Sequence, residues 1–177
     1  MLRRLAESLA GWRLAGFYTE ELRIAGRRVG FRAVTFDGAA RTMAHVEHRG
    51  PRVGAYGVDL GVIDALADGT LHLAPGIDAY LVDEIGKMEC LSARFVTRMR
   101  TLLDAGRPVV ATIAERGAGF VAEVKARREV EIWTVTPSTR DALPDRARDW
   151  LLARRGSGDP SGRSVLPGAS APRTRPP

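Results

Sequence analysis

Apolar positions along the chain recur at two different spacings, and these spacings predict helices and strands in alternation. Leucines at helical spacing in residues 2–9 predict an amphipathic helix that opens the chain. From residue 14 to residue 46 the pattern becomes that of strands, interrupted by turn signals that end at Gly26 and Gly38. Turns of this kind join neighbouring strands, so this region predicts consecutive antiparallel hairpins.

The second half of the chain alternates strands with helices. Helical patterns cover residues 62–67 and 91–102, and a last helix is expected after Pro144. Short apolar runs at 109–113 and 130–135 are typical of strands buried in parallel sheets. We therefore expect an α/β fold whose mainly parallel sheet carries an antiparallel hairpin insert.

Composition changes abruptly after residue 155. Thirteen of the residues in 156–177 are Gly, Ser or Pro, which leaves almost nothing to bury. We expect one α/β domain over 1–155 and a disordered tail over 156–177.

Charge and cysteine content restrict the expected partners and location. The net charge is +6, but the arginines are scattered and no helix-turn-helix or zinc-finger pattern accompanies them, so we expect no nucleic-acid partner. No apolar run is long enough to span a membrane. The single cysteine, Cys90, cannot form an internal disulfide, which favours the cytoplasm.

Candidate chemistry follows one strand. The apolar run Tyr80–Val82 is followed by adjacent carboxylates, Asp83 and Glu84. Ligands of open α/β sheets bind at the carboxyl ends of strands. Asp83 there would hold Mg²⁺ through its water shell, and Glu84 would orient and deprotonate a water for attack on a γ-phosphate. The alternative is that both acids are simply the exit of a strand into solvent.

Four segments in order together resemble one protein family. They are GFYTEELR (16–23), RRVGF (27–31), DEIGKME (83–89) and VTPSTRDALP (135–144). They are similar to the small P-loop nucleoside-triphosphatases, which hydrolyse nucleoside triphosphates, ATP and GTP among them, to the diphosphate and phosphate. The resemblance covers roughly residues 1–155 and implies a RecA-like, three-layer P-loop fold with Mg²⁺ as cofactor.

The resemblance also implies roles for individual residues. Asp83 would be the metal carboxylate and Glu84 the base that activates water. Gly86 and Lys87 would belong to the nucleotide-binding loop. The hairpin insert would lie near the active site, where Arg23 would stabilise charge on the transferred phosphoryl group; the alternative is that its arginines only pair with carboxylates across strands.

The chain departs from this family in one respect. Relatives begin with a strand and a Walker A loop of the form GxxxxGK[ST], and no such loop occurs in the 177 residues. Either the true start lies upstream, or triphosphate binding has been lost. We favour the first, since loss of a middle strand would leave backbone groups of its neighbours unpaired.

The sequence thus predicts a cytoplasmic, Mg²⁺-dependent nucleoside-triphosphatase that lacks its first strand and whose activity is impaired because the Walker A loop is absent. A non-catalytic α/β binding or regulatory module derived from such an enzyme is the alternative. The preferred nucleotide and the oligomeric state stay open.

Overall fold

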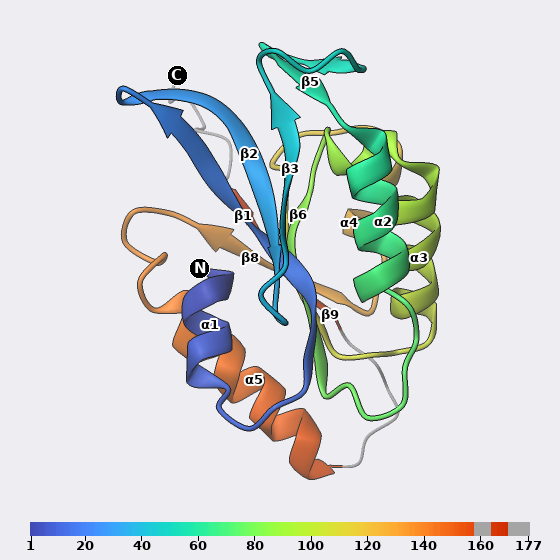
Figure 1. Ribbon diagram of the computed structural model, residues 1–177. Coiled ribbons are helices and arrows are strands. Elements are labelled where there is room, and N and C mark those ends of the chain that lie inside the picture. Colours follow the sequence, from blue (N-terminus) through green and yellow to red (C-terminus); the bar gives the residue numbers. More distant parts are fainter. Residues whose placement is uncertain (158–163, 170–177) are drawn as a thin grey trace, which may run out of the picture.

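The computed structural model describes residues 1–157 and 164–169, and one mixed sheet with helices on both faces organises them (Figure 1). The helices are α1 (Leu2–Ser8), α2 (Leu60–Thr70), α3 (Ala93–Asp104), α4 (Phe120–Ala126) and α5 (Leu143–Ser157), with a 3-10 turn η1 (Glu89–Leu91). The strands are β1 (Leu14–Ile24), β2 (Arg27–Thr35), β3 (Ala40–His45), β4 (Arg52–Val53), β5 (Tyr56–Val58), β6 (Ala79–Ile85), β7 (Val109–Ile113), β8 (Val130–Val135) and β9 (Ser164–Ala169).

The described strands form a single sheet in the order β4-β5-β3-β2-β1-β6-β7-β9-β8. β1, β6, β7, β9 and β8 run parallel to one another, whereas β2, β3, β5 and β4 extend the sheet from β1 by antiparallel pairing. This arrangement confirms the expected α/β class, with its parallel sheet and antiparallel insert.

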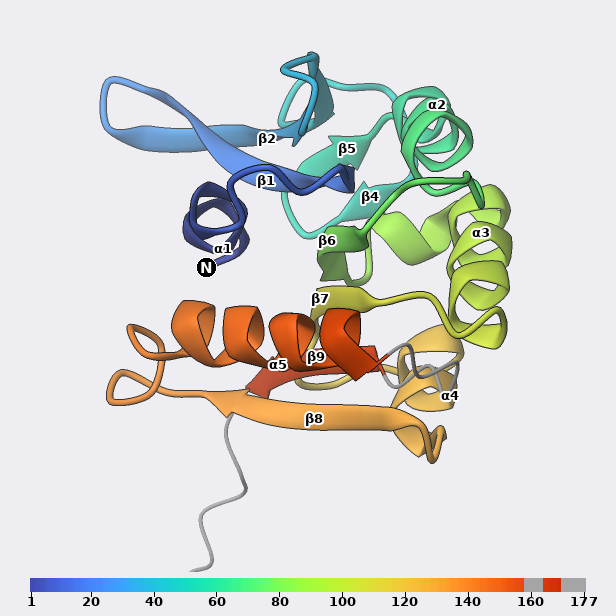
Figure 2. The ribbon, with the colours of Figure 1, turned by 90° about the horizontal axis from the view of Figure 1, so that it is seen from below.

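Alternate side chains of β6 enter two different cores. Ala79 and Leu81 pack in a cluster with apolar residues of α1 and α5. Tyr80 and Val82 pack in the other cluster, with residues of α2, α3 and α4. Because successive side chains of a strand point to opposite faces, a strand buried on both sides reads as one continuous apolar run. The result is the predicted three-layer arrangement (Figure 2).

Local sequence explains how the insert and the first long helix are bounded. Ala25 and Gly26 both have positive φ, at 47° and 79°, as a two-residue hairpin turn requires. α2 begins earlier than the apolar spacing predicted, because the side chain of Asp59 accepts a hydrogen bond from the backbone N–H of Val62.

The end of the chain differs in part from the expectation of a disordered tail over 156–177. α5 continues to Ser157, and the backbone of Ser164–Ala169 pairs in parallel with both β7 and β8. A strand at that position supplies hydrogen-bond partners to two neighbours, which composition alone does not reveal. The rest of the expected tail, 158–163 and 170–177, lies outside the described residues.

No helix in the described part of the chain is long and apolar enough to span a bilayer.

Candidate functional site

Strand β6 carries both candidate acids at an irregularity in its pairing with β7. Val82 pairs with Ala111 and Ile85 with Ile113, so Asp83 and Glu84 together lie opposite the single intervening residue of β7. Two residues against one is the arrangement of a β-bulge, which re-aims side chains near functional sites. The strand also extends to Ile85, so the acids lie within it rather than beyond it as the apolar run suggested.

The carboxylate of Asp83 is held from both neighbouring strands. One oxygen accepts hydrogen bonds from the backbone N–H and the hydroxyl of Thr19 on β1, at 3.3 and 3.0 Å. The other oxygen accepts a hydrogen bond from the hydroxyl of Thr112, the β7 residue that faces the bulge. Asp83 is therefore fixed in position, with hydroxyl oxygens close to it on two sides.

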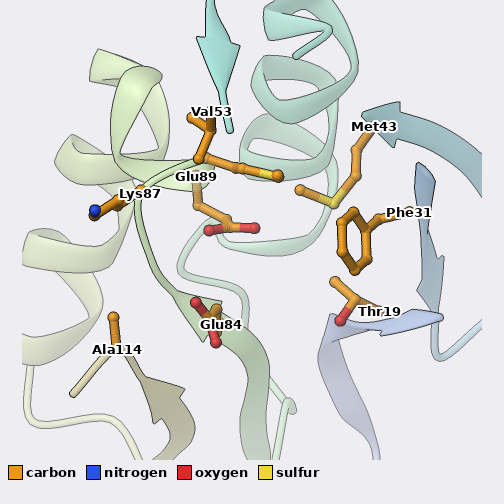
Figure 3. Close-up of a pocket in the computed structure, with 9 residues that line it drawn as sticks. Thr19, Phe31, Met43, Val53, Glu84, Lys87, Glu89 and Ala114 are labelled. Atoms are coloured by element: carbon orange, nitrogen blue, oxygen red, sulfur yellow. The ribbon is translucent and has the colours of Figure 1, made fainter. Parts of the chain in front are cut away.

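Glu84 instead turns toward a cavity of about 350 Å³ (Figure 3). Its side chain is accessible to solvent from that cavity, while surrounding protein atoms partly desolvate the carboxyl. This desolvation, together with the nearby charge of Asp83, raises the pKa of Glu84. A carboxylate with a raised pKa is a stronger base, which suits a group that takes a proton from water.

A third acid, Glu89 in η1, points into the same cavity and faces Glu84 (Figure 3). Glu89 is only 4% exposed, and burial raises its pKa to about 8. The nearby charges of Glu84 and Asp83 raise the pKa by smaller amounts. DEIGKME contains this residue, but the sequence pattern predicted no role for it. An acid between the apolar residues Met88 and Cys90 was the signal that could have found it.

The hairpin insert provides most of the remaining wall of the cavity. Thr19 comes from β1, Phe31 from β2, Met43 from β3 and Val53 from β4, and the wall is completed by Met88 and Ala114. The expectation that the insert lies near the candidate acids therefore agrees with the structure.

The structure separates Arg23 from the other predicted site residues. Its guanidinium donates to the carboxylate of Glu21 and to the backbone carbonyl of Gly26 at the hairpin turn, and it does not line the cavity. The contact between Arg23 and Glu21 lies within β1, whereas Arg28 on β2 donates to Glu21 across the strands.

Gly86 and Lys87 follow β6 directly and lie beside Glu84. A Cβ atom at Gly86 would overlap the Oε1 atom of Glu84, so the absence of a side chain there leaves room for the carboxylate. Lys87 lines the cavity, but its amino nitrogen points away from the carboxylates of Glu84 and Glu89 (Figure 3). Across the described residues, no three or more His, Cys, Asp or Glu side chains are grouped so that they could hold a metal ion by themselves.

Comparisons with known proteins find one family. A family model described as NTPase matches residues 1–147. The chain is 36% identical over 143 residues to the nucleoside-triphosphatase THEP1 of Thermotoga sp. (strain RQ2), covering 80% of this chain and 82% of the relative. It is 38% identical over 146 residues to the human cancer-related nucleoside-triphosphatase, covering 73% and 77% of the two chains.

Two solved structures share the fold. The crystal structure of THEP1 from Aquifex aeolicus superposes with a TM-score of 0.76 at 30% identity, covering 85% of this chain and 90% of that one. The solution structure of a human cancer-related nucleoside triphosphatase gives a TM-score of 0.70 at 32% identity, with coverages of 88% and 90%. These similarities confirm the expected P-loop NTPase-like α/β fold.

Proposed function

This chain belongs to the NTPase family of nucleoside-triphosphatases, and from that premise we propose that it hydrolyses nucleoside triphosphates to the diphosphate and phosphate with Mg²⁺. Hydrolase character and nucleotide binding follow from the family. The assignment of individual residues rests on one observation: the bulge in β6 anchors Asp83 between two threonines while turning Glu84 toward a cavity.

The oxygen atoms around Asp83 fit a magnesium ion. Mg²⁺ prefers oxygen ligands and keeps several waters, so it is bound through one or two carboxylates together with substrate phosphates. A set of three acidic or imidazole ligands is therefore not required. Asp83, with the hydroxyls of Thr19 and Thr112 beside it, supplies such a donor set. When bound, the ion would neutralise charge on the phosphates.

Glu84 would orient the attacking water and take its proton. Its carboxyl opens onto the cavity, and burial and Asp83 raise its pKa, which makes the carboxylate a stronger base. Gly86 would keep the carboxylate in place by leaving it space, and Lys87, which lines the cavity, would contribute a positive charge to the nucleotide-binding loop. Arg23 is left out of the proposed mechanism, because its guanidinium is bound to Glu21.

The printed residues contain no GxxxxGK[ST] loop, which in P-loop enzymes cradles the phosphates with backbone N–H groups. We therefore expect the 177-residue chain to release phosphate slowly. The same absence supports the alternative of a non-catalytic binding or regulatory module. ATP, GTP and related nucleotides are the proposed substrates, and the single cysteine supports our expectation of a cytoplasmic location.

The decisive variant is Glu84→Gln, which removes the base and preserves shape. It would be made in the 177-residue chain and in a version that carries a strand and a GxxxxGK[ST] loop ahead of Met1. In the latter, Mg²⁺-dependent phosphate release should fall at least about 100-fold while nucleotide affinity is kept. Glu47→Gln, at an exposed position, is the matched control. Unchanged hydrolysis in Glu84→Gln would refute the role, and nucleotide binding without turnover in the parent protein that carries the added loop would favour the module.

A further inference from the structure

The cavity beside Glu84 has two chemically different sides (Figure 3). One side presents the carboxyl groups of Glu84 and Glu89. The other is apolar, with Phe31, Met43 and Val53 contributed by three strands of the insert. The proposed hydrolysis uses Glu84, but it gives no role to Glu89 or to the apolar wall.

The volume of the cavity is far larger than a hydrolytic water needs. A water molecule occupies about 30 Å³ in the liquid and is held by two to four polar partners. The cavity measures about 350 Å³, and side chains that cannot hydrogen-bond form much of its wall. Sites of this size with an apolar lining and a few polar groups are typical of small organic ligands.

Glu89 is a buried acid without a side-chain partner. Only backbone N–H groups, those of Gly86 and of Glu89 itself, approach its carboxyl, and no side chain of the described residues donates to it. A charge in such a position is costly unless a cation or a strong donor accompanies it. An organic cation would satisfy Glu89 and the apolar wall together.

We propose that this cavity binds a small organic amine, with its ammonium group between the carboxylates of Glu84 and Glu89 and its apolar body against Phe31, Met43 and Val53. Charge-assisted hydrogen bonds to carboxylates are among the strongest in proteins, and an aromatic face also attracts cations.

If the chain hydrolyses nucleotides as proposed above, a bound amine should also slow that hydrolysis. The ammonium group would stand beside Glu84, where the attacking water is expected. A bound amine that offers no acceptor group of its own would therefore exclude the water and slow hydrolysis.

The methionine methyl groups offer a direct test of binding in the 177-residue chain, without nucleotide. Of the four methionines, Met43 and Met88 line the cavity, whereas Met99 is buried in the core between sheet and helices and Met1 lies in the other core cluster. With methyl-labelled methionine, benzylamine should shift the NMR signals of Met43 and Met88 saturably and leave those of Met1 and Met99 in place. Equal shifts of all four signals, or none, would overturn the proposal.

Variants and related probes separate the proposed contacts. Glu89→Gln should weaken benzylamine binding at least about tenfold, and Val53→Trp, which fills the cavity, should abolish it. Leu73→Trp, at an exposed position, is the control for an added indole, and the Met99 signal reports that each variant is folded. Benzyl alcohol should bind more weakly than benzylamine. Equal binding of the two probes, or shifts produced by Mg²⁺ alone that block benzylamine, would refute an organic-cation site. Because no nucleotide is present, these results are independent of whether the chain hydrolyses one.

Discussion

Replacing Glu89 by glutamine should remove most of the pH dependence of this protein's stability at neutral pH. Glu89 is 4% exposed, and burial raises its pKa from 4.5 to about 8. Between these two values the folded chain keeps a proton that the unfolded chain has released. The free energy of unfolding therefore falls as the pH rises, because stability increases with pH only where the unfolded state binds more protons.

The size of the effect follows from the two pKa values. Each pH unit between them changes the free energy of unfolding by about 1.4 kcal/mol. The contribution of Glu89 is therefore complete below about pH 4.5, and about 5 kcal/mol of it is lost by about pH 8. This is a large share of the 5–15 kcal/mol that holds a typical domain folded. Glutamine has nearly the same shape and does not ionise, so the variant should lack this loss. The raised pKa of Glu84 would leave a weaker slope in the same direction.

Urea unfolding, followed by tryptophan fluorescence at a series of pH values from about 5 to about 8.5, measures the effect directly. The curves for wild type and Glu89→Gln should diverge as the pH rises, with the variant becoming the more stable protein. Glu47→Gln, which changes an exposed glutamate, should follow the wild type at every pH. Parallel curves for wild type and Glu89→Gln would show that Glu89 is not a buried proton-holding group.

Three further substitutions test other contacts. Gly86→Ala would push the carboxylate of Glu84 out of place. In the version that carries the GxxxxGK[ST] loop, kcat should therefore fall by about tenfold or more while KM changes little. A rise in KM as large as the fall in kcat would contradict this. Gly16→Ala adds a Cβ onto the carbonyl oxygen of Leu81 at a φ of 104°, and should lower the free energy of unfolding by about 3 kcal/mol or more, measured by urea denaturation. Tyr80→Phe removes both hydrogen bonds of a buried hydroxyl and should cost about 1–3 kcal/mol in the same assay, where an unchanged midpoint would refute the contact.

Much of the fold could be predicted because periodicity reports local structure. The apolar run of β6 and the glycine turn at Gly26 are encoded within a few residues, and both lie where the sequence placed them. The adjacent acids Asp83 and Glu84 were also identified from their position after that run. The extent of α2 was underestimated, since a capping residue such as Asp59 adds a turn without adding an apolar position.

Partners distant in the sequence could not be predicted in the same way. Thr19 lies 64 positions from Asp83, and the bulge opposite Thr112 depends on how β6 and β7 are registered. The position of β9 between β7 and β8 likewise depends on backbone groups of those two strands that require hydrogen-bond partners. The Gly/Pro-rich composition of this segment had predicted disorder. Arg23 was assigned from the resemblance, which implied that the hairpin insert lies near the active site, but its side chain donates to Glu21.

The sequence by itself determined the alternation of elements, the family and the strand that bears the acids, because each of these is written in short-range pattern. Only the tertiary structure decided which acid is anchored, which faces the cavity, and that Glu89 joins them. Burial and hydrogen-bond partners arise when separate strands come together, so the protonation of these carboxyls is a property of the packed molecule rather than of any segment.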